Sequence, residues 1–257
     1  HVVMGESVAL KNTTKVIEAN KATVKQMVLH SLASAEATLS GDEREMGVVL
    51  VDIGGGTTDI VIYRQGQPWY SAVIPLGGSQ LTRDLSVALK TPLYMTEEMK
   101  IKWGSVMPEL VAAEEEVVIP SFQGQPKHSL SRRILCSPLH DRMLELIKLI
   151  VLKVRQSGLR ELPTGGLVLT GGGSEMTGLA DLVQKTLGGS VRIAYPEGIA
   201  GLPAQLRKPA FSAAVGLLLW GIKHQGETRS SLNGGRSIMG SKSWRWGLGR
   251  KKATATR

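Results

Sequence analysis

Residues 47–63 read Gly-Val-Val-Leu-Val-Asp-Ile-Gly-Gly-Gly-Thr-Thr-Asp-Ile-Val-Ile-Tyr, and this stretch decides the fold. Apolar, β-branched runs stand on both sides of a short turn of glycine and threonine, a pattern that predicts a β-hairpin. Glycines let the backbone turn tightly and bring bare amides against a ligand. Successive N–H groups in such a turn form a concavity that binds anions. The stretch therefore predicts a hairpin whose turn binds phosphate groups.

The acid at the end of the first apolar run, Asp52, suits a magnesium ion held through water, because magnesium usually keeps part of its hydration shell. Turn and acid together predict a site for a metal-bound polyphosphate. A Walker loop is excluded because no lysine follows the glycines, and a Rossmann loop is excluded because the turn leads into a second strand. From the residues alone, an ordinary glycine-rich hairpin stays open as the alternative.

Length and composition limit the class of protein. The 257 residues are 42% hydrophobic, which is enough for two domains with cores. The sequence has no run of 18 apolar residues and no visible secretory signal, so we expect no membrane-spanning segment. The single cysteine, Cys136, excludes an internal disulfide and fits a reducing compartment.

The net charge of +9 is unevenly distributed along the chain. Residues 223–257 hold nine Lys/Arg and one acid, a net of +8, whereas residues 1–222 hold 22 Lys/Arg and 21 acids, a net of +1. A nucleic-acid-binding domain carries basic charge on a folded face. We therefore expect no specific nucleic acid partner.

Hydrophobic spacing predicts the other elements of the chain. The expected strands are 24–29, 70–75, 167–170 and 191–193. The expected helices are 7–20, 32–39, one opened by Gly77-Gly78, 96–104 with Thr96 as N-cap, one from Ser137-Pro138 to Gly158, 179–187 and 211–221. Residues 40–45 are expected to form a polar turn, and residues 106–136 irregular strands and turns.

Two further features are weak signals by themselves. A second glycine turn, residues 171–174, stands between an expected strand and an expected helix, and such turns are often purely structural. Glu97 and Lys100 lie three residues apart on one helical face, which a simple surface ion pair explains.

In combination, these segments resemble the actin-like ATPase superfamily. Residues 52–59 resemble its second phosphate loop, residues 170–174 its adenosine motif, and the small-residue helices at 32–39 and 213–217 its two connecting helices. The resemblance implies an α/β fold, an actin-like (ribonuclease H-like) ATPase domain with a mixed sheet flanked by helices and a smaller inserted α+β subdomain. The superfamily's first phosphate loop is missing, so we expect a truncated protein.

Within that superfamily the sequence is most similar to the FtsA family of bacterial cell division proteins. The similarity is carried by residues 32–35, 42–47, 51–59, 73–78, Glu97-x-x-Lys100-x-x-x-Gly104 and 209–217. It implies the following domains: the end of an FtsA-specific inserted subdomain (1–20), the remainder of the first ATPase domain (21–45), the second ATPase domain (46–222, with its smaller subdomain at about 80–137), a flexible linker (223–237) and a membrane-targeting tail (238–257).

The resemblance also implies ATP and Mg²⁺ as cofactors and gives roles to residues. Asp52 would order the magnesium ion through water, Glu97 and Lys100 would contact the ribose, and the two glycine turns would border the phosphates and the adenosine. The residues of these turns are Gly54, Gly55, Gly56, Thr57 and Thr58, and Gly171, Gly172, Gly173 and Ser174. His30 stands where relatives that hydrolyse ATP well often have glutamate, so ATPase activity is expected to be weak or absent, and no catalytic residue is assigned.

By similarity, the protein would tether FtsZ to the cytoplasmic side of the cell membrane, as a peripheral protein, and polymerise during septal ring assembly. Its expected partners are the C-terminal peptide of FtsZ, further copies of itself, and an anionic membrane surface bound by the tail. Trp244, Trp246 and the basic residues of the tail suit such a surface, although a disordered basic tail stays open. Lys127, Arg132 and Arg133 are a candidate contact for the acidic FtsZ peptide, with a solvated basic loop as the alternative.

Other functions on the same fold stay open at this point. A pilus-assembly ATPase related to PilM shares the fold and an adaptor role. A sugar kinase needs a carboxylate base, and no acid of this chain can be assigned to that role. A DnaK-type chaperone adds a substrate-binding domain, and only 35 residues follow Ile222.

Overall fold

The computed structural model describes residues 3–119 and 128–224. The chain forms two units, residues 1–24 with 224–257, and residues 25–223, which are described separately. In the first unit, the helix α1 (Ser7–Ala19) has no buried side chain. The predicted helix at 7–20 is thus confirmed.

The second unit contains the sheet and the helices that cover it. Its strands are β1 (Val48–Ile53), β2 (Thr58–Arg64), β3 (Gln67–Ile74), β4 (Glu116–Ile119), β5 (His128–Ser131), β6 (Leu167–Thr170) and β7 (Val191–Ile193). Its α-helices are α2 (His30–Thr38), α3 (Gly41–Met46), α4 (Gly78–Leu89), α5 (Leu93–Trp103), α6 (Arg132–Gln156), α7 (Leu179–Leu187) and α8 (Ser212–His224, whose last residue falls in the first unit). Short 3₁₀ helices are η1 (Pro108–Leu110), η2 (Gly172–Glu175), η3 (Ala204–Leu206) and η4 (Pro209–Phe211).

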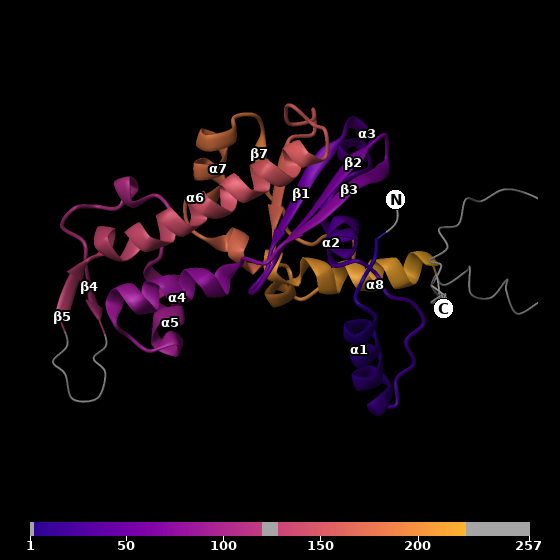
Figure 1. Ribbon diagram of the computed structural model, residues 1–257, viewed down its shortest axis with the longest axis horizontal. Helices are drawn as coiled ribbons and strands as arrows, with labels where there is room; N and C mark the ends of the chain where they lie inside the picture. Colours follow the sequence, from indigo (N-terminus) through magenta and orange to yellow (C-terminus); the bar gives the residue numbers. More distant parts are fainter. Residues whose placement is uncertain (1–2, 120–127, 225–257) are drawn as a thin grey trace, which may run out of the picture. The chain divides into compact units, whose positions relative to one another are not determined.

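Five strands form a mixed sheet in the order β3-β2-β1-β6-β7. β1, β2 and β3 are antiparallel neighbours, and β6 and β7 run parallel to β1. The hairpin at 48–63 and the third strand that follows it are therefore confirmed. A separate antiparallel pair, β4 and β5, lies with α4 and α5 at one end of the long helix α6 (Figure 1).

Helices cover both faces of the sheet, and the two-residue period of β1 assigns its side chains to them. Val49, Val51 and Ile53 belong to the larger core, which includes α4, α6 and α7. Leu50 belongs to the core on the other face, together with Ala35 of α2. Asp52 continues the series of Leu50 and so faces α2. The alternation of side chains along β1 therefore accounts for the position of Asp52 on the face covered by α2.

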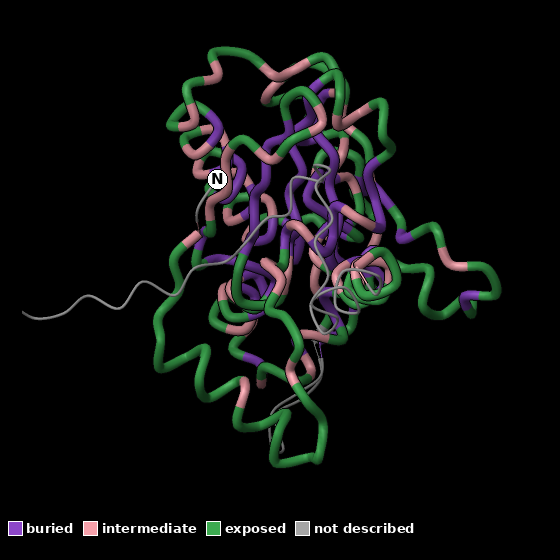
Figure 2. Tube along the Cα trace, turned by 90° about the vertical axis from the view of Figure 1, so that its right-hand side faces the viewer, coloured by how far each residue is buried: buried purple, intermediate pink, exposed green. Residues whose placement is uncertain are grey.

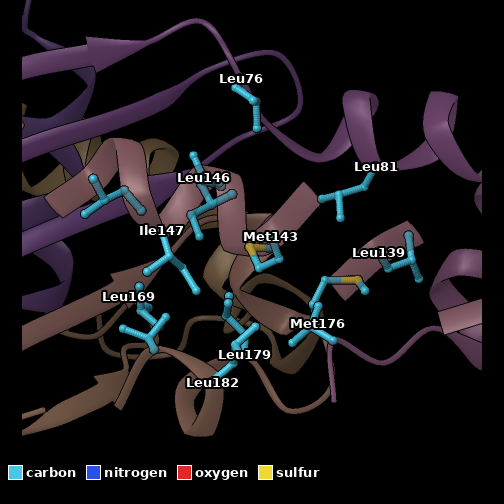
Figure 3. Close-up of a cluster of buried hydrophobic side chains, with 14 of the residues drawn as sticks. Leu76, Leu81, Leu139, Met143, Leu146, Ile147, Leu169, Met176, Leu179 and Leu182 are labelled. Carbon is cyan, nitrogen blue, oxygen red and sulfur yellow. The ribbon is translucent and has the colours of Figure 1, made fainter. Parts of the chain in front are cut away.

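The larger core is built on α6. Leu139, Met143, Leu146 and Ile147 lie on the inner face of this helix and are essentially unexposed. Figure 3 shows these side chains meeting those of α4, β6 and α7. The strands β1, β2 and β6 are buried along nearly all of their length, and buried segments gather in the centre of Figure 2. This packing fixes the strand ends from which the candidate site projects.

Small residues bring α2 close to its neighbours. Ala33, Ser34 and Ala35 are buried. A Cβ added to Gly216 of α8 would overlap the carbonyl oxygen of Ala33, so the two helices cross in direct backbone contact. The helices predicted at 32–39 and 211–221 are therefore confirmed, and their small residues let them pack closely.

Two predictions for the region before the hairpin are wrong. Residues 24–29 form no strand, because they pair with none of the described strands and are exposed or only half-buried. Residues 40–45 are not a plain turn, because α3 begins there: Ser40 caps the helix and Glu43 closes a capping box. The motif Ser-x-x-Glu carried that information in the sequence.

Two predicted helix starts are also wrong. Helix α5 begins at Leu93, and Thr96 lies inside it, where its buried hydroxyl donates to the carbonyl of Pro92, as threonine can do within a helix. Helix α6 begins at Arg132, so Pro138 lies inside it and not at its first position. Buried Leu135 and Cys136 hold the earlier turns against the core, and this burial outweighs the helix-breaking effect of the proline.

Candidate nucleotide site

The turn between β1 and β2 presents open backbone amides. The N–H of Gly54 donates to Thr57 O at 2.9 Å and closes the turn. Gly55, Gly56 and Thr57 are exposed, and within the described residues their N–H groups donate to no protein acceptor. No atom lies within 4 Å of the place that a Cβ on Gly56 would take. The turn thus offers a free row of donors, as its sequence predicted.

The two threonines of this turn have different roles. The hydroxyl of Thr57, on the exposed side, donates to Asp59 Oδ2 at 3.1 Å. Thr58 is fully buried, and its hydroxyl donates to the carbonyl of Leu76 at 2.8 Å, which ties the start of β2 to the segment after β3. The hydroxyl of Thr58 is therefore committed inside the protein, and Thr57 carries the hydroxyl on the open side.

Asp52 is buried at the base of the turn, where it accepts a hydrogen bond from the hydroxyl of Ser34. It stands directly opposite Asp59 in the β1–β2 register. Burial raises the pKa of Asp52 above its ordinary value, and the nearby Asp59 acts in the same direction, while Ser34 and His30 oppose the rise. A buried carboxylate with a second acid beside it is stabilised in its charged form by a cation.

His30, the first residue of α2, completes this acidic corner. Its Nδ1 lies 3.5 Å from Asp52 Oδ2 and 3.8 Å from Asp59 Oδ2, and its side chain is 52% exposed. The resemblance implied that His30 stands where relatives often have glutamate, but it did not imply contact with the two acids. The available signal was the spacing of His30 and Ser34, four residues apart and so on one face of α2.

The second glycine turn crosses the end of β1. Gly171 has φ +82°, and a Cβ there would overlap Asp52 Oδ1 and Ile53 O. A Cβ on Gly173 would overlap the side chain of Ile53. Ser174 is buried, and its hydroxyl donates to the carbonyl of Gly171 at 2.7 Å. The two predicted glycine turns thus meet at Asp52, and in the second turn Gly172 alone is exposed.

Sequence reasoning missed the segment that lies beside this second turn. The N–H of Gly171 donates to the carbonyl of Pro209 in η4 at 3.2 Å. A Cβ on Gly172 would stand 3.6 Å from the Cβ of Ala210. The surface next to Gly172 therefore includes η4, which precedes the last helix.

Glu97 and Lys100 form the predicted ion pair, at 2.7 Å. The pair is not a simple surface pair, because Lys100 is only 8% exposed. Its Nζ also reaches Gly78 O and Thr82 Oγ1 in α4. Burial acts to raise the pKa of Glu97, but hydrogen bonds from Lys100 and Thr82 hold this pKa below its ordinary value.

The basic residues predicted to contact an acidic peptide are partly engaged elsewhere. Arg132 donates to Trp103 O at 2.7 Å and to Glu115 at 2.8 Å. Arg133 donates through Nε to Val111 O at 2.6 Å. Lys127 lies outside the described residues. The proposed contact therefore keeps Arg133 as its exposed member.

The arrangement at the strand ends fits a nucleotide with a hydrated magnesium ion. Free amides suit phosphate oxygens, and buried Asp52 suits the positive charge of the ion's water shell. Within the described residues, no group of three or more His, Cys, Asp or Glu side chains is placed to hold a metal ion. Magnesium would therefore have to be shared between Asp52, water and the phosphates.

Comparison with known proteins gives matches to a family of cell division proteins. Residues 49–216 match the family model described as "Cell division protein FtsA". The chain is 39% identical over 237 residues to the cell division protein FtsA of Pseudomonas aeruginosa, covering 92% of this chain and 57% of that protein. It is 36% identical over 235 residues to FtsA of Neisseria meningitidis, covering 91% of this chain and 57% of that protein. The chain thus spans somewhat more than half the length of these relatives.

Solved structures show the same fold. MreB5 of Spiroplasma citri bound to ADP superposes with a TM-score of 0.66 at 16% identity, covering 90% of this chain and 69% of that one. The PilM–PilN type IV pilus biogenesis complex gives a TM-score of 0.63 at 19% identity, covering 83% of this chain and 58% of that one. The predicted actin-like fold is therefore confirmed, while identities this low carry no argument for a role in pilus assembly.

Proposed function

Because the chain belongs to the FtsA family of cell division proteins, we propose that it binds Mg-ATP and polymerises, and that it tethers FtsZ to the cytoplasmic side of the cell membrane. Family membership supports the role in cell division. Since the chain spans about 57% of its relatives' length, the ATP site and the partners are proposals about the full-length protein.

One observation carries the proposal of ATP binding. The free amides of Gly55, Gly56 and Thr57 open next to buried Asp52, and the turn at 171–174 crosses the same strand end. Phosphates would be bound by the first turn and adenosine by the second. The related fold of MreB5 was solved bound to ADP and also to AMPPNP, which supports the same use of this fold here.

Calorimetry with Mg-ATP on the full-length protein tests the site. We expect Asp52→Ala to lower the affinity about 10–100-fold or to abolish its dependence on magnesium, as loss of an outer-sphere carboxylate does. Asp141→Ala, on an exposed position of α6, is the matched control and should bind normally. Unchanged Mg-ATP affinity in Asp52→Ala would reject the assignment.

We propose that ATP hydrolysis is weak or absent. Where relatives that hydrolyse ATP well often have glutamate, this chain has His30. Its imidazole Nδ1 lies within 4 Å of both Asp52 and Asp59. A glutamate at this place would orient the attacking water. We expect His30→Glu to raise the rate of phosphate release, and an equal or lower rate would contradict this reading.

The proposed binding of the FtsZ C-terminal peptide rests on family membership and on charge complementarity. Arg133 is the exposed basic residue of the proposed contact. In fluorescence anisotropy, Arg133→Glu should weaken peptide binding, and added salt should weaken the wild-type complex. Arg155→Glu, at the other end of α6, is the control. Binding that ignores both the charge reversal and salt would place the peptide elsewhere.

Attachment to the membrane is proposed for residues 238–257, which lie outside the described residues. Within residues 3–119 and 128–224, no helix combines the length and apolar character that a bilayer-spanning segment needs. Each basic residue near an anionic surface contributes about 1 kcal/mol, and tryptophan favours the headgroup region. Polymerisation would strengthen this attachment through avidity.

Co-sedimentation of the polymerising protein with anionic vesicles tests this attachment. We expect Trp244→Ala/Trp246→Ala to lower the bound fraction, and Ser241→Ala/Ser243→Ala, in the same segment, to leave it unchanged. Neutral vesicles should bind less protein than anionic ones. A wild-type protein that ignores anionic vesicles at physiological salt would rule out the tether.

A further inference from the structure

The loop between β1 and β2, residues 54–57, is held from one side by the start of α4. The N–H of Gly78 donates to Gly54 O at 2.9 Å, and the N–H of Ser79 donates to Gly55 O at 2.7 Å. Gly78 and Ser79 are the first two residues of α4, and N–H groups at this place have no acceptor within their own helix. The start of α4 therefore uses its free donors to bind two carbonyl groups of the loop.

The side chain of Ser79 adds a second hydrogen bond to one of these carbonyl groups. Its hydroxyl donates to Gly55 O at 2.7 Å, and this is the same oxygen that receives the N–H of Ser79. A carbonyl oxygen has two lone pairs, so the two bonds fill its capacity as an acceptor. Ser79 is exposed, and its hydroxyl makes this bond although water is available to it.

Fixing these two carbonyl groups also fixes the direction of the next two N–H groups. The peptide bonds of the loop are trans, and in a planar trans peptide the C=O and N–H bonds point in opposite directions. Because the oxygens of Gly54 and Gly55 point at α4, the N–H groups of Gly55 and Gly56 point away from it. Within the described residues, neither of these N–H groups donates to a protein acceptor. The start of α4 thus turns the donors of the loop toward its open side.

The glycines make this support necessary. Glycine adopts positive and negative φ about equally well, so the peptide plane between Gly55 and Gly56 can turn over at little steric cost. The reversed plane would present the oxygen of Gly55, which carries partial negative charge, to a phosphate group in place of the N–H of Gly56. A row of N–H groups binds an anion because all of them point to it. A bond that holds this plane therefore favours binding of a polyphosphate.

We propose that Ser79 is a positioning residue for the phosphate site: its hydroxyl holds the peptide between Gly55 and Gly56 so that the N–H of Gly56 faces the ligand. The inference rests on the ATP binding proposed above and adds to that site a residue outside both glycine turns. Ser79 acts through the backbone of Gly55, so a polyphosphate without base or sugar needs this support as much as ATP does.

Calorimetry on the full-length protein with Mg-ATP and with magnesium tripolyphosphate, which has no ribose, measures the effect on binding. Ser79→Ala should weaken both ligands about fivefold, the equivalent of one hydrogen bond. Ser79→Thr keeps the hydroxyl and should bind both ligands as the wild type does. Ser86→Ala is the matched control, because the hydroxyl of Ser86 also belongs to α4 but donates to Thr91 O. Unchanged affinities in Ser79→Ala, or a loss for ATP alone, would overturn the proposal.

Relaxation-dispersion NMR of the backbone amides, without ligand, distinguishes positioning from direct contact. Ser79→Ala should show exchange between conformations at residues 55–57, and the wild type and Ser79→Thr should not. Weaker binding by Ser79→Ala with an unchanged ligand-free loop would mean that the hydroxyl acts on the ligand itself, and would overturn the proposal. If the wild type binds neither ligand, the proposed ATP site fails, while the relaxation measurement still decides whether Ser79 holds the loop.

Discussion

The two glycine triplets, residues 54–56 and residues 171–173, look alike in sequence, yet glycine is needed in them for different reasons. In the first triplet, Gly55 and Gly56 are exposed and have open space around them. In the second, Gly171 and Gly173 are pressed against the end of β1. The first triplet is suited to let a ligand approach the backbone, and the second lets the chain cross a strand. The difference shows that a glycine motif does not reveal whether it serves binding or packing.

The largest effect is expected for Gly171→Ala. Gly171 has φ +82°, and the added Cβ would overlap Asp52 and Ile53. A strained backbone and overpacking each cost about 1–3 kcal/mol, so we expect the free energy of unfolding to fall by about 3 kcal/mol. Denaturant unfolding measures it. A loss below about 0.5 kcal/mol would remove the contrast between the triplets.

Gly56→Ala, unlike Gly171→Ala, should leave stability almost unchanged and should weaken the binding of Mg-ATP. The backbone of Gly56 lies outside the left-handed region, and a Cβ there meets no atom within 4 Å. We expect stability to change by less than about 0.5 kcal/mol and Mg-ATP affinity to fall about tenfold, because the methyl group would occupy the space of the phosphates. Unfolding and calorimetry on the same preparation check both values. Normal affinity would mean that this triplet is not a phosphate site.

Asp52, where the two turns meet, gives a pH-dependent prediction. Its pKa is raised by burial, so the folded state holds the proton more tightly than the unfolded state. The stability that Asp52 contributes is therefore present below the ordinary carboxyl pKa of about 4 and is lost as pH rises through the higher folded value. Without nucleotide, Asp52→Asn should melt a few degrees above the wild type at neutral pH. The two melting temperatures should converge toward about pH 4, and a wild type that is the more stable one at pH 7 would contradict this.

The sequence predicted the parts of the fold that depend on local pattern. The spacing of apolar residues and the glycines at turns predicted the hairpin, the third strand, β6, β7 and the small-residue helices. The starts of α5 and α6 were wrong because Thr96 and Pro138 look like helix starts, whereas burial of the residues before Pro138 decides where α6 begins. Cap preferences are worth about 1 kcal/mol, and burial of several side chains exceeds that.

The candidate site was predicted to a similar extent. Both glycine turns and Asp52 follow from the sequence, because they lie at strand ends that the pattern located. The contacts of His30 with the acids and of Lys100 with Gly78 join segments more than 20 residues apart. Such contacts depend on how the helices pack on the sheet, and no spacing within one segment contains that information.

The smallest effect is expected for Gly172→Ala, and this variant is the sharpest test of the comparison between the two glycine triplets. Gly172 is the exposed member of the second triplet, its φ is not positive, and the added Cβ would be in ordinary contact, 3.6 Å from the Cβ of Ala210. Stability should change by less than about 0.5 kcal/mol. If adenosine lies against this turn, ATP should bind several-fold more weakly, while magnesium tripolyphosphate should bind as before.

Gly56→Ala is the control for that selectivity, because it should weaken ATP and tripolyphosphate alike. The two variants then separate the ends of the nucleotide: one residue affects the ligand only when a base and sugar are present, and the other affects any polyphosphate. Titration of both ligands into both variants gives four affinities. If Gly172→Ala weakens tripolyphosphate as much as ATP, the second turn borders the phosphates too, and the division of the site between the two triplets is wrong.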